Sequence, residues 1–136
     1  MDILVILSLG LVLLSHILID FDRQRMNKPI LHWLSAMLVF AVSVFFGFLV
    51  DVIVGVAWWK FTILSLCVHL AVFDPLWNLL HNNYIFYQGD PNNPNRAFTD
   101  KIWDRVPPLG QIFFRLWFIL VGVAIFSHWD LIVGHN

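Results

Sequence analysis

The sequence contains no glutamate, one cysteine and few charged residues of either sign. All nine acidic residues are aspartates, which excludes mechanisms that need a glutamate, including a di-iron carboxylate bundle. Cys67 lies alone in an apolar run, so a disulfide framework and a cysteine metal site are both excluded. Charged residues make up 12% of the chain and the net charge is -1, which gives no basis for expecting nucleic acid as a partner.

Apolar residues dominate what is present. Hydrophobic residues account for 60% of the 136 residues, more than a water-soluble domain of this length can hide in one core. Apolar runs of about 17 to 25 residues predict membrane-spanning helices, and the chain has four of them. The sequence therefore predicts one transmembrane domain, residues 1–136, with an all-α fold: an integral membrane four-helix bundle with helices near 3–19, 30–50, 56–73 and 112–133.

The second and third helices come from one run, residues 30–73, which is too long for a single crossing. Asp51, Gly55 and Lys60 lie near its middle, together with Trp58 and Trp59. A tight hairpin there places polar and aromatic residues at the membrane surface, where they are favoured.

Residues 82–110 form the one long polar segment between apolar runs. Its centre is rich in glycine, proline and asparagine, which predicts a loop. Thr99 is placed to cap a short amphipathic helix that runs to Val106 and is stopped by Pro107 and Pro108. We expect this helix to lie at the membrane interface and the segment to be ordered over the mouth of the bundle.

The basic residues predict the orientation of the chain, because loops rich in lysine and arginine stay in the cytoplasm. Seven of the eight fall at one end of the predicted helices, Lys60 being the exception. The seven are Arg23, Arg25, Lys28, Arg96, Lys101, Arg105 and Arg115. We therefore expect a multi-pass cell membrane protein with both termini on the non-cytoplasmic side; in a bacterium, that membrane is the inner one.

The stretch HLAVFDPLWNLLHNN, residues 69–83, has two interpretations. Proline disfavours helical geometry in the residue before it, so the spanning helix is expected to end or kink there. Asp74 is interpreted as an N-cap and Pro75 as the first residue of a new helical piece. Against this, Asp74, Asn78 and His81 project within roughly 60° of one another on a helix. The second interpretation makes these three residues part of a functional site.

Two further polar residues are expected at the same depth. His16 and Asp20 are four residues apart, so they share a helix face and can bond to each other. Polar side chains facing lipid are unfavourable, which turns such residues inward. The candidate polar cavity therefore consists of His16, Asp20, Asp74, Asn78 and His81.

Metal and haem sites have weak support from the sequence. The HExxH pattern is missing, and no other local motif predicts metal ligands. Two imidazoles from different helices at matched depth can ligate haem iron, and His16 and His69 are the candidates for such a pair. No catalytic residue and no cofactor is assigned.

Three functions follow as hypotheses. The first is an accessory, assembly or binding component of a membrane complex, with the lipid bilayer, a membrane protein or a second copy of the chain as partner. The second is an oligomeric transporter or pore. The third is a haem- or metal-binding redox or enzyme subunit with its site at the cytoplasmic ends of the first and third helices.

Overall fold

The fold is all-α, as predicted, with four long apolar helices and one short helix. In the computed structural model, residues 3–25, 32–81, 83 and 98–132 are described. They form α1 (Ile3–Arg25), α2 (His32–Val54), α3 (Trp58–Leu80), α4 (Phe98–Trp103) and α5 (Pro108–Ile132). Each of the four long helices is long and apolar enough to cross a membrane, which supports a multi-pass membrane protein.

The helices extend further than the apolar runs that predict them. α1 continues to Arg25, and α3 continues past residue 73 to Leu80. α5 starts at Pro108. Proline is favoured at the first helical position, because an N–H at that position has no partner in the helix and its absence costs nothing. The short helix exists but spans Phe98–Trp103, and residues 84–97 of the predicted loop lie outside the described residues.

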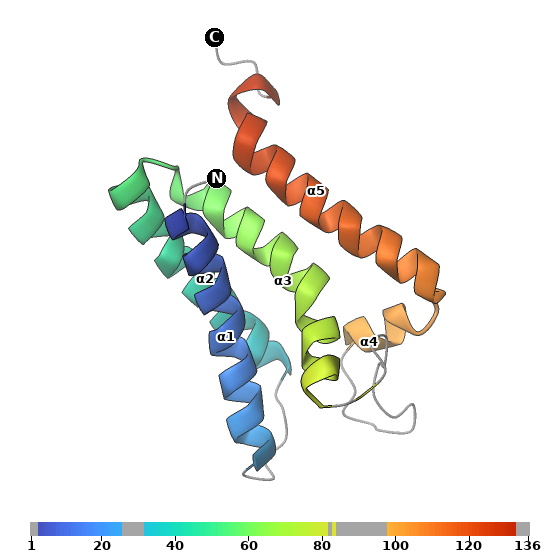
Figure 1. Cartoon of the computed structure of the whole chain (residues 1–136). Coiled ribbons are helices and arrows are strands. Elements are labelled where there is room, and N and C mark those ends of the chain that lie inside the picture. The colour runs from blue at the N-terminus through green and yellow to red at the C-terminus, as the bar shows by residue number, and fades with distance from the viewer. Residues whose placement is uncertain (1–2, 26–31, 82, 84–97, 133–136) are drawn as a thin grey trace.

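α3 is the central helix of the molecule. It packs against α1, α2 and α5, while α1 also packs against α2. Of the long helices, only α3 forms an extensive interface with α5, so α5 is attached along one side (Figure 1). The N-terminal end of α1 and the C-terminal end of α5 lie at one end of the molecule, and α4 lies toward the other.

The hairpin between α2 and α3 is present, as the sequence predicts. Gly55 has a φ of 75°, and its N–H donates to the Asp51 carbonyl at 2.9 Å. The Asp51 carboxylate Oδ2 accepts from the Trp58 N–H at 3.2 Å, which satisfies a free donor at the start of α3. A Cβ added at Gly47 would lie 2.6 Å from the Trp58 carbonyl oxygen, so this glycine allows α2 and α3 to approach closely.

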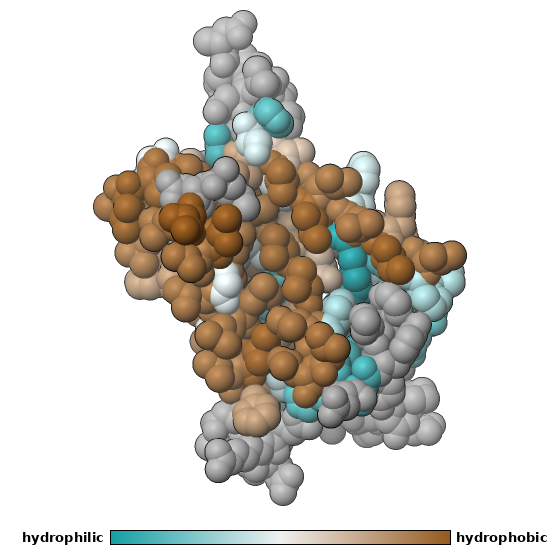
Figure 2. Space-filling model, viewed as in Figure 1, coloured by the Kyte–Doolittle hydropathy of each residue, from teal (hydrophilic) through white to brown (hydrophobic). Residues whose placement is uncertain are grey.

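The outer surface of the long helices is apolar. Hydrophobic residues cover most of the visible face in Figure 2. The buried apolar core is small and consists of Val5, Leu9, Val50, Phe61 and Leu64. Many of the remaining buried positions hold polar side chains, and these define the candidate site.

Candidate functional site

The polar residues form two separate clusters, one on each side of α3. The imidazole chain consists of Ser35, Asp20, His16 and His69 and joins α2, α1 and α3. The arginine clamp consists of Arg115 with the Asp74 carboxylate and the carbonyls of Leu70 and Ala71, and it joins α5 to α3. The two clusters share no residue.

The imidazole chain is a line of close polar contacts. Ser35 Oγ donates to Asp20 Oδ1 at 3.0 Å. Asp20 Oδ2 lies 3.2 Å from His16 Nε2, in a close polar contact without the alignment of a hydrogen bond. His16 Nδ1 and His69 Nε2 are 3.0 Å apart and are hydrogen-bonded.

The position of these residues follows from helix geometry. His16 and Asp20 are one turn apart on α1, as predicted, and both face α2 and α3. The rings of His16 and His69 stack on each other and on Phe73, with ring centroids 4.0 Å apart for His16 and Phe73. The aromatic ring of Phe73 therefore packs against both imidazoles and helps to fix their orientation.

The imidazole chain is buried and lies within the candidate membrane spans. His16, Asp20 and Ser35 have exposed fractions of 7%, 5% and 4%, and His69 is half-buried. A buried polar group without a hydrogen bond is destabilising. Two ring nitrogens of the pair, His69 Nδ1 and His16 Nε2, are buried and have no hydrogen-bond partner, although His16 Nε2 lies close to Asp20 Oδ2.

His16 and His69, the candidate haem ligands, do lie together, but in direct contact. Two nitrogens that ligate one metal from opposite sides, each at about 2.0 Å, are separated by about 4 Å. The observed 3.0 Å between His16 Nδ1 and His69 Nε2 is a hydrogen-bond distance. Within the described residues, no group of three or more His, Cys, Asp or Glu side chains is arranged to hold a metal ion.

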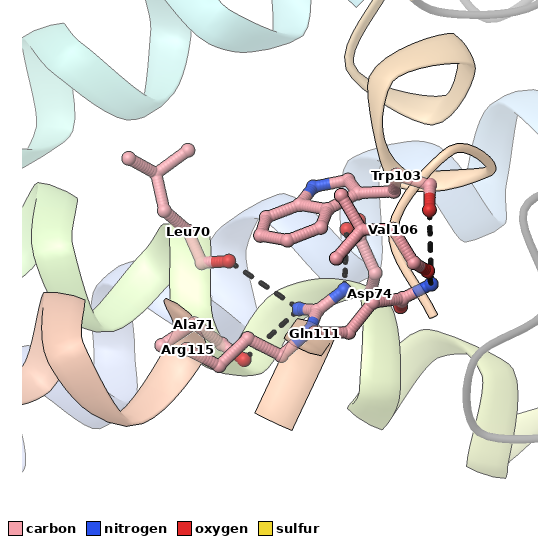
Figure 3. A network of polar contacts seen from close by, with 7 residues as sticks. All are labelled: Leu70, Ala71, Asp74, Trp103, Val106, Gln111 and Arg115. Carbon is pink, nitrogen blue, oxygen red and sulfur yellow. Dashed lines mark hydrogen bonds and ion pairs between the residues drawn. The ribbon is translucent and has the colours of Figure 1, made fainter. Parts of the chain in front are cut away.

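The arginine clamp is built around a proline inside α3. Pro75 has no N–H, so the carbonyl of Ala71, four residues earlier, loses its helical partner. Arg115 Nη1 donates to that carbonyl at 3.0 Å and to the Leu70 carbonyl at 3.4 Å, while Nη2 donates to Asp74 Oδ2 at 3.4 Å (Figure 3). A side chain of α5 thus donates to the Ala71 carbonyl, which the proline leaves without a helical donor.

This arrangement corrects the interpretation of Asp74 as an N-cap. α3 is continuous from Trp58 to Leu80 with Pro75 in its interior, and it changes direction along its length (Figure 1). Proline kinks a helix without ending it when other groups satisfy the freed carbonyl. Here Arg115 does so, and the Asp74 carboxylate accepts from the same guanidinium.

α4 is anchored to the same cluster. The Arg115 guanidinium lies 4.9 Å from the centroid of the Trp103 ring, a cation–π contact. Gln111 Nε2 donates to the carbonyls of Trp103 and Val106 at 3.0 Å each, which satisfies acceptors at the end of α4 (Figure 3). The sequence indicates Arg115 only as a signal of orientation and gives no signal that Gln111 belongs to the site.

The other two candidates lie near the end of α3. Asn78 is buried, with an exposed fraction of 4%. His81 Nδ1 is 2.9 Å from the Trp77 carbonyl, and its ring lies against the Trp77 ring with centroids 4.2 Å apart. The structure therefore brings His16 and Asp20 together with His69 and Ser35, and it places Asp74 and His81 in other surroundings.

The sequence indicates one partner of the His16 and Asp20 pair and misses the other. Ser35 lies in the first turn of α2, close to where the chain returns from α1, but a serine in an apolar run gives no distinctive signal. Matched depth in the bilayer indicates His69 as a partner of His16.

Comparisons with models of known protein families, with curated proteins and with solved structures found no match.

Proposed function

We propose that the protein is an accessory, assembly or binding component of a membrane complex, with α5 as its docking helix. The observation that carries this proposal is the one-sided attachment of α5 to α3. Large apolar side chains on α5 are exposed, among them Phe113, Leu116, Trp117 and Leu120. Most of the circumference of α5 is thus available to lipid, to another membrane protein or to a second copy of the chain.

Recognition by this surface rests on apolar packing. The polar side chain of Arg115 is turned toward α3 and is engaged there. Inside a bilayer, helices associate through close packing and hydrogen bonds, since lipid and protein are equally apolar. Trp117, with an exposed fraction of 54%, offers a large and rigid contact surface for a partner helix.

Photo-crosslinking in native membranes tests the docking helix. A photoreactive amino acid replaces Trp117 on α5, and the matched control replaces Met37, which is exposed at 63% on α2. α2 already packs against two neighbours, so the proposal expects a discrete protein adduct from position 117 and lipid adducts alone from position 37. Lipid adducts alone from both positions would contradict it.

The proposal includes an orientation with both termini on the non-cytoplasmic side. Lys101 and Arg105 are exposed beside α4, and Arg115 lies near the start of α5. Basic residues at that end favour the cytoplasm. Single cysteines at Asn136 and Asn93, introduced after Cys67→Ser, report the sidedness: a membrane-impermeant reagent outside the cell should label 136 and spare 93, and the reverse pattern would invert the assignment.

The imidazole chain favours a second candidate, transport by an oligomer. Ionisable residues within membrane spans commonly belong to proton or ion pathways. Purified protein in liposomes loaded with a pH-sensitive dye distinguishes this candidate: flux that depends on His16 supports transport, and an impermeable vesicle leaves the docking role.

A further inference from the structure

The Asp20 carboxylate determines which ring nitrogens in the imidazole chain carry hydrogen. The Ser35 hydroxyl donates to Asp20 Oδ1, and Asp20 Oδ2 faces His16 Nε2 at 3.2 Å. A ring nitrogen that carries hydrogen is attracted to a carboxylate oxygen, whereas a nitrogen lone pair is repelled by it. His16 Nε2 is therefore the protonated nitrogen of that ring.

The positions of the other ring hydrogens follow from one property of imidazole. A neutral imidazole has one donor nitrogen and one acceptor nitrogen. His16 Nδ1 is then an acceptor, so His69 Nε2 must donate the 3.0 Å hydrogen bond between the rings. His69 Nδ1 is left with a lone pair and has no hydrogen-bond partner. His16 Nε2 also lacks an aligned hydrogen bond, but it faces Asp20 Oδ2 at 3.2 Å.

We propose that His69 Nδ1 is a proton-binding site, and that His16 and Asp20 are the relay behind it. The proton comes from hydronium in the aqueous phase, and an N–H bond forms at His69 Nδ1. The proton of His69 Nε2 then moves to His16 Nδ1, which breaks one N–H bond and forms another. The positive charge moves from His69 to His16, beside the Asp20 carboxylate, and His69 is neutral again.

Charge balance within the span supports this assignment. Before uptake, the cluster carries the single negative charge of Asp20; after uptake of one proton, it is neutral overall. Separated charges inside a membrane are unfavourable, and opposite charges in contact are the common exception. The 3.2 Å contact between His16 and Asp20 provides that pairing.

Several other ionisable groups on the packed helices lie in contacts of their own. On α3, Asp74 accepts from Arg115 of α5, and His81 Nδ1 lies against the Trp77 carbonyl. Lys60 lies over the Trp59 ring, and Asp51 of α2 accepts from the Trp58 N–H. α2 presents the uncharged Ser35 to Asp20. The proton-binding site thus involves α1, α2 and α3, and it is independent of the docking surface on α5.

Nitrogen NMR of the full chain in lipid nanodiscs, with isotope-labelled histidine, tests the proposal. His16→Gln and His69→Gln assign the two rings. In alkaline buffer, we expect both rings to carry hydrogen on Nε2 alone. On acidification, His69 Nδ1 should gain a proton and the signals of both rings should change in one transition. Hydrogen on His16 Nδ1 in alkaline buffer, or a change at His69 without a response from His16, would overturn the proposal.

Asp20→Asn tests the role of the carboxylate, with Asp51→Asn as the matched control. Asp51 accepts a hydrogen bond at the start of α3, at the other end of that helix. We expect His16 to lose its single tautomer in Asp20→Asn and to keep it in Asp51→Asn. An unchanged His16 tautomer in folded Asp20→Asn would contradict the relay, and the measurement on the unmodified chain stands even where that variant does not assemble.

Discussion

The imidazole chain and the arginine clamp place polar groups at comparable burial on opposite sides of α3, but they differ in chemistry. In the clamp, a guanidinium that remains protonated in proteins donates to two backbone carbonyls and a carboxylate. In the imidazole chain, two histidine rings share one hydrogen bond, and His69 Nδ1 has no hydrogen-bond partner. The first arrangement suits a fixed structural tie, and the second suits a group that takes up a proton.

Removal of the clamp should have the largest effect on stability. Arg115→Leu leaves the Ala71 carbonyl without its donor and the Asp74 carboxylate without its cation. We expect a loss of about 3 kcal/mol in the free energy of unfolding, measured by denaturant titration in mixed micelles. A loss under about 1 kcal/mol would show that water or lipid replaces the guanidinium.

The proline accounts for part of that effect, which a double-mutant cycle can isolate. Pro75→Ala restores the N–H at position 75 that can donate to the Ala71 carbonyl. Arg115→Leu should therefore be less destabilising in the Pro75→Ala background. We expect a coupling energy of about 1 kcal/mol between the two positions. Additive effects would mean that the clamp does not compensate for the kink.

Close helix approach on the side of the imidazole chain should give the next largest effect. A Cβ at Gly47 would meet the Trp58 carbonyl at 2.6 Å, and that backbone atom cannot move alone. Gly47→Ala should destabilise the protein by about 2 kcal/mol, the range typical of overpacking. Gly10→Ala is the control, because nothing lies within 4 Å of its Cβ position, and equal effects at both sites would contradict the described packing.

The hydrogen bond at the start of the imidazole chain should contribute less. Ser35→Ala removes the donor to Asp20 Oδ1 and should cost about 0.6 kcal/mol, the average for hydrogen bonds between membrane helices. Thermal unfolding in the same micelles measures it. Ser35→Cys keeps a weak donor, so its stability should lie between those of the unmodified protein and Ser35→Ala. A larger loss of stability for Ser35→Cys than for Ser35→Ala would argue against this bond.

The smallest effect is expected at Asp74. Asp74→Asn keeps an acceptor for Arg115, and the Asp74 side chain is 33% exposed, so solvent weakens the ion pair. We expect a change of less than about 0.5 kcal/mol. A marked loss of the crosslinked adduct or of flux in liposomes, at unchanged stability, would instead indicate that the charge of Asp74 is functional.

The sequence predicts the helices well and their ends less well. Four apolar runs and a hairpin near Gly55 are local signals, and the structure has both. At Pro75 the sequence allows an end or a kink, and the structure has the kink. The helix does not end there because the compensating donor, Arg115, comes from a helix about forty residues further along the chain. A local rule cannot include a partner that is brought close only by packing.

The candidate site shows the same limit. The contact of His16 with Asp20 follows from their spacing along α1. Grouping Asp74 and His81 with them assumed that equal depth means contact, whereas packing turns Asp74 toward α5. Ser35 lies on a different helix from Asp20, so their contact depends on how α1 and α2 pack.

The hydrogen bond between His16 and His69 is the centre of this account, and NMR can detect it directly. In the full chain in a bilayer, we predict a scalar coupling between His69 Nε2 and His16 Nδ1, transmitted through the shared hydrogen. Its absence, together with rapid exchange of both ring hydrogens with water, would contradict the buried imidazole chain.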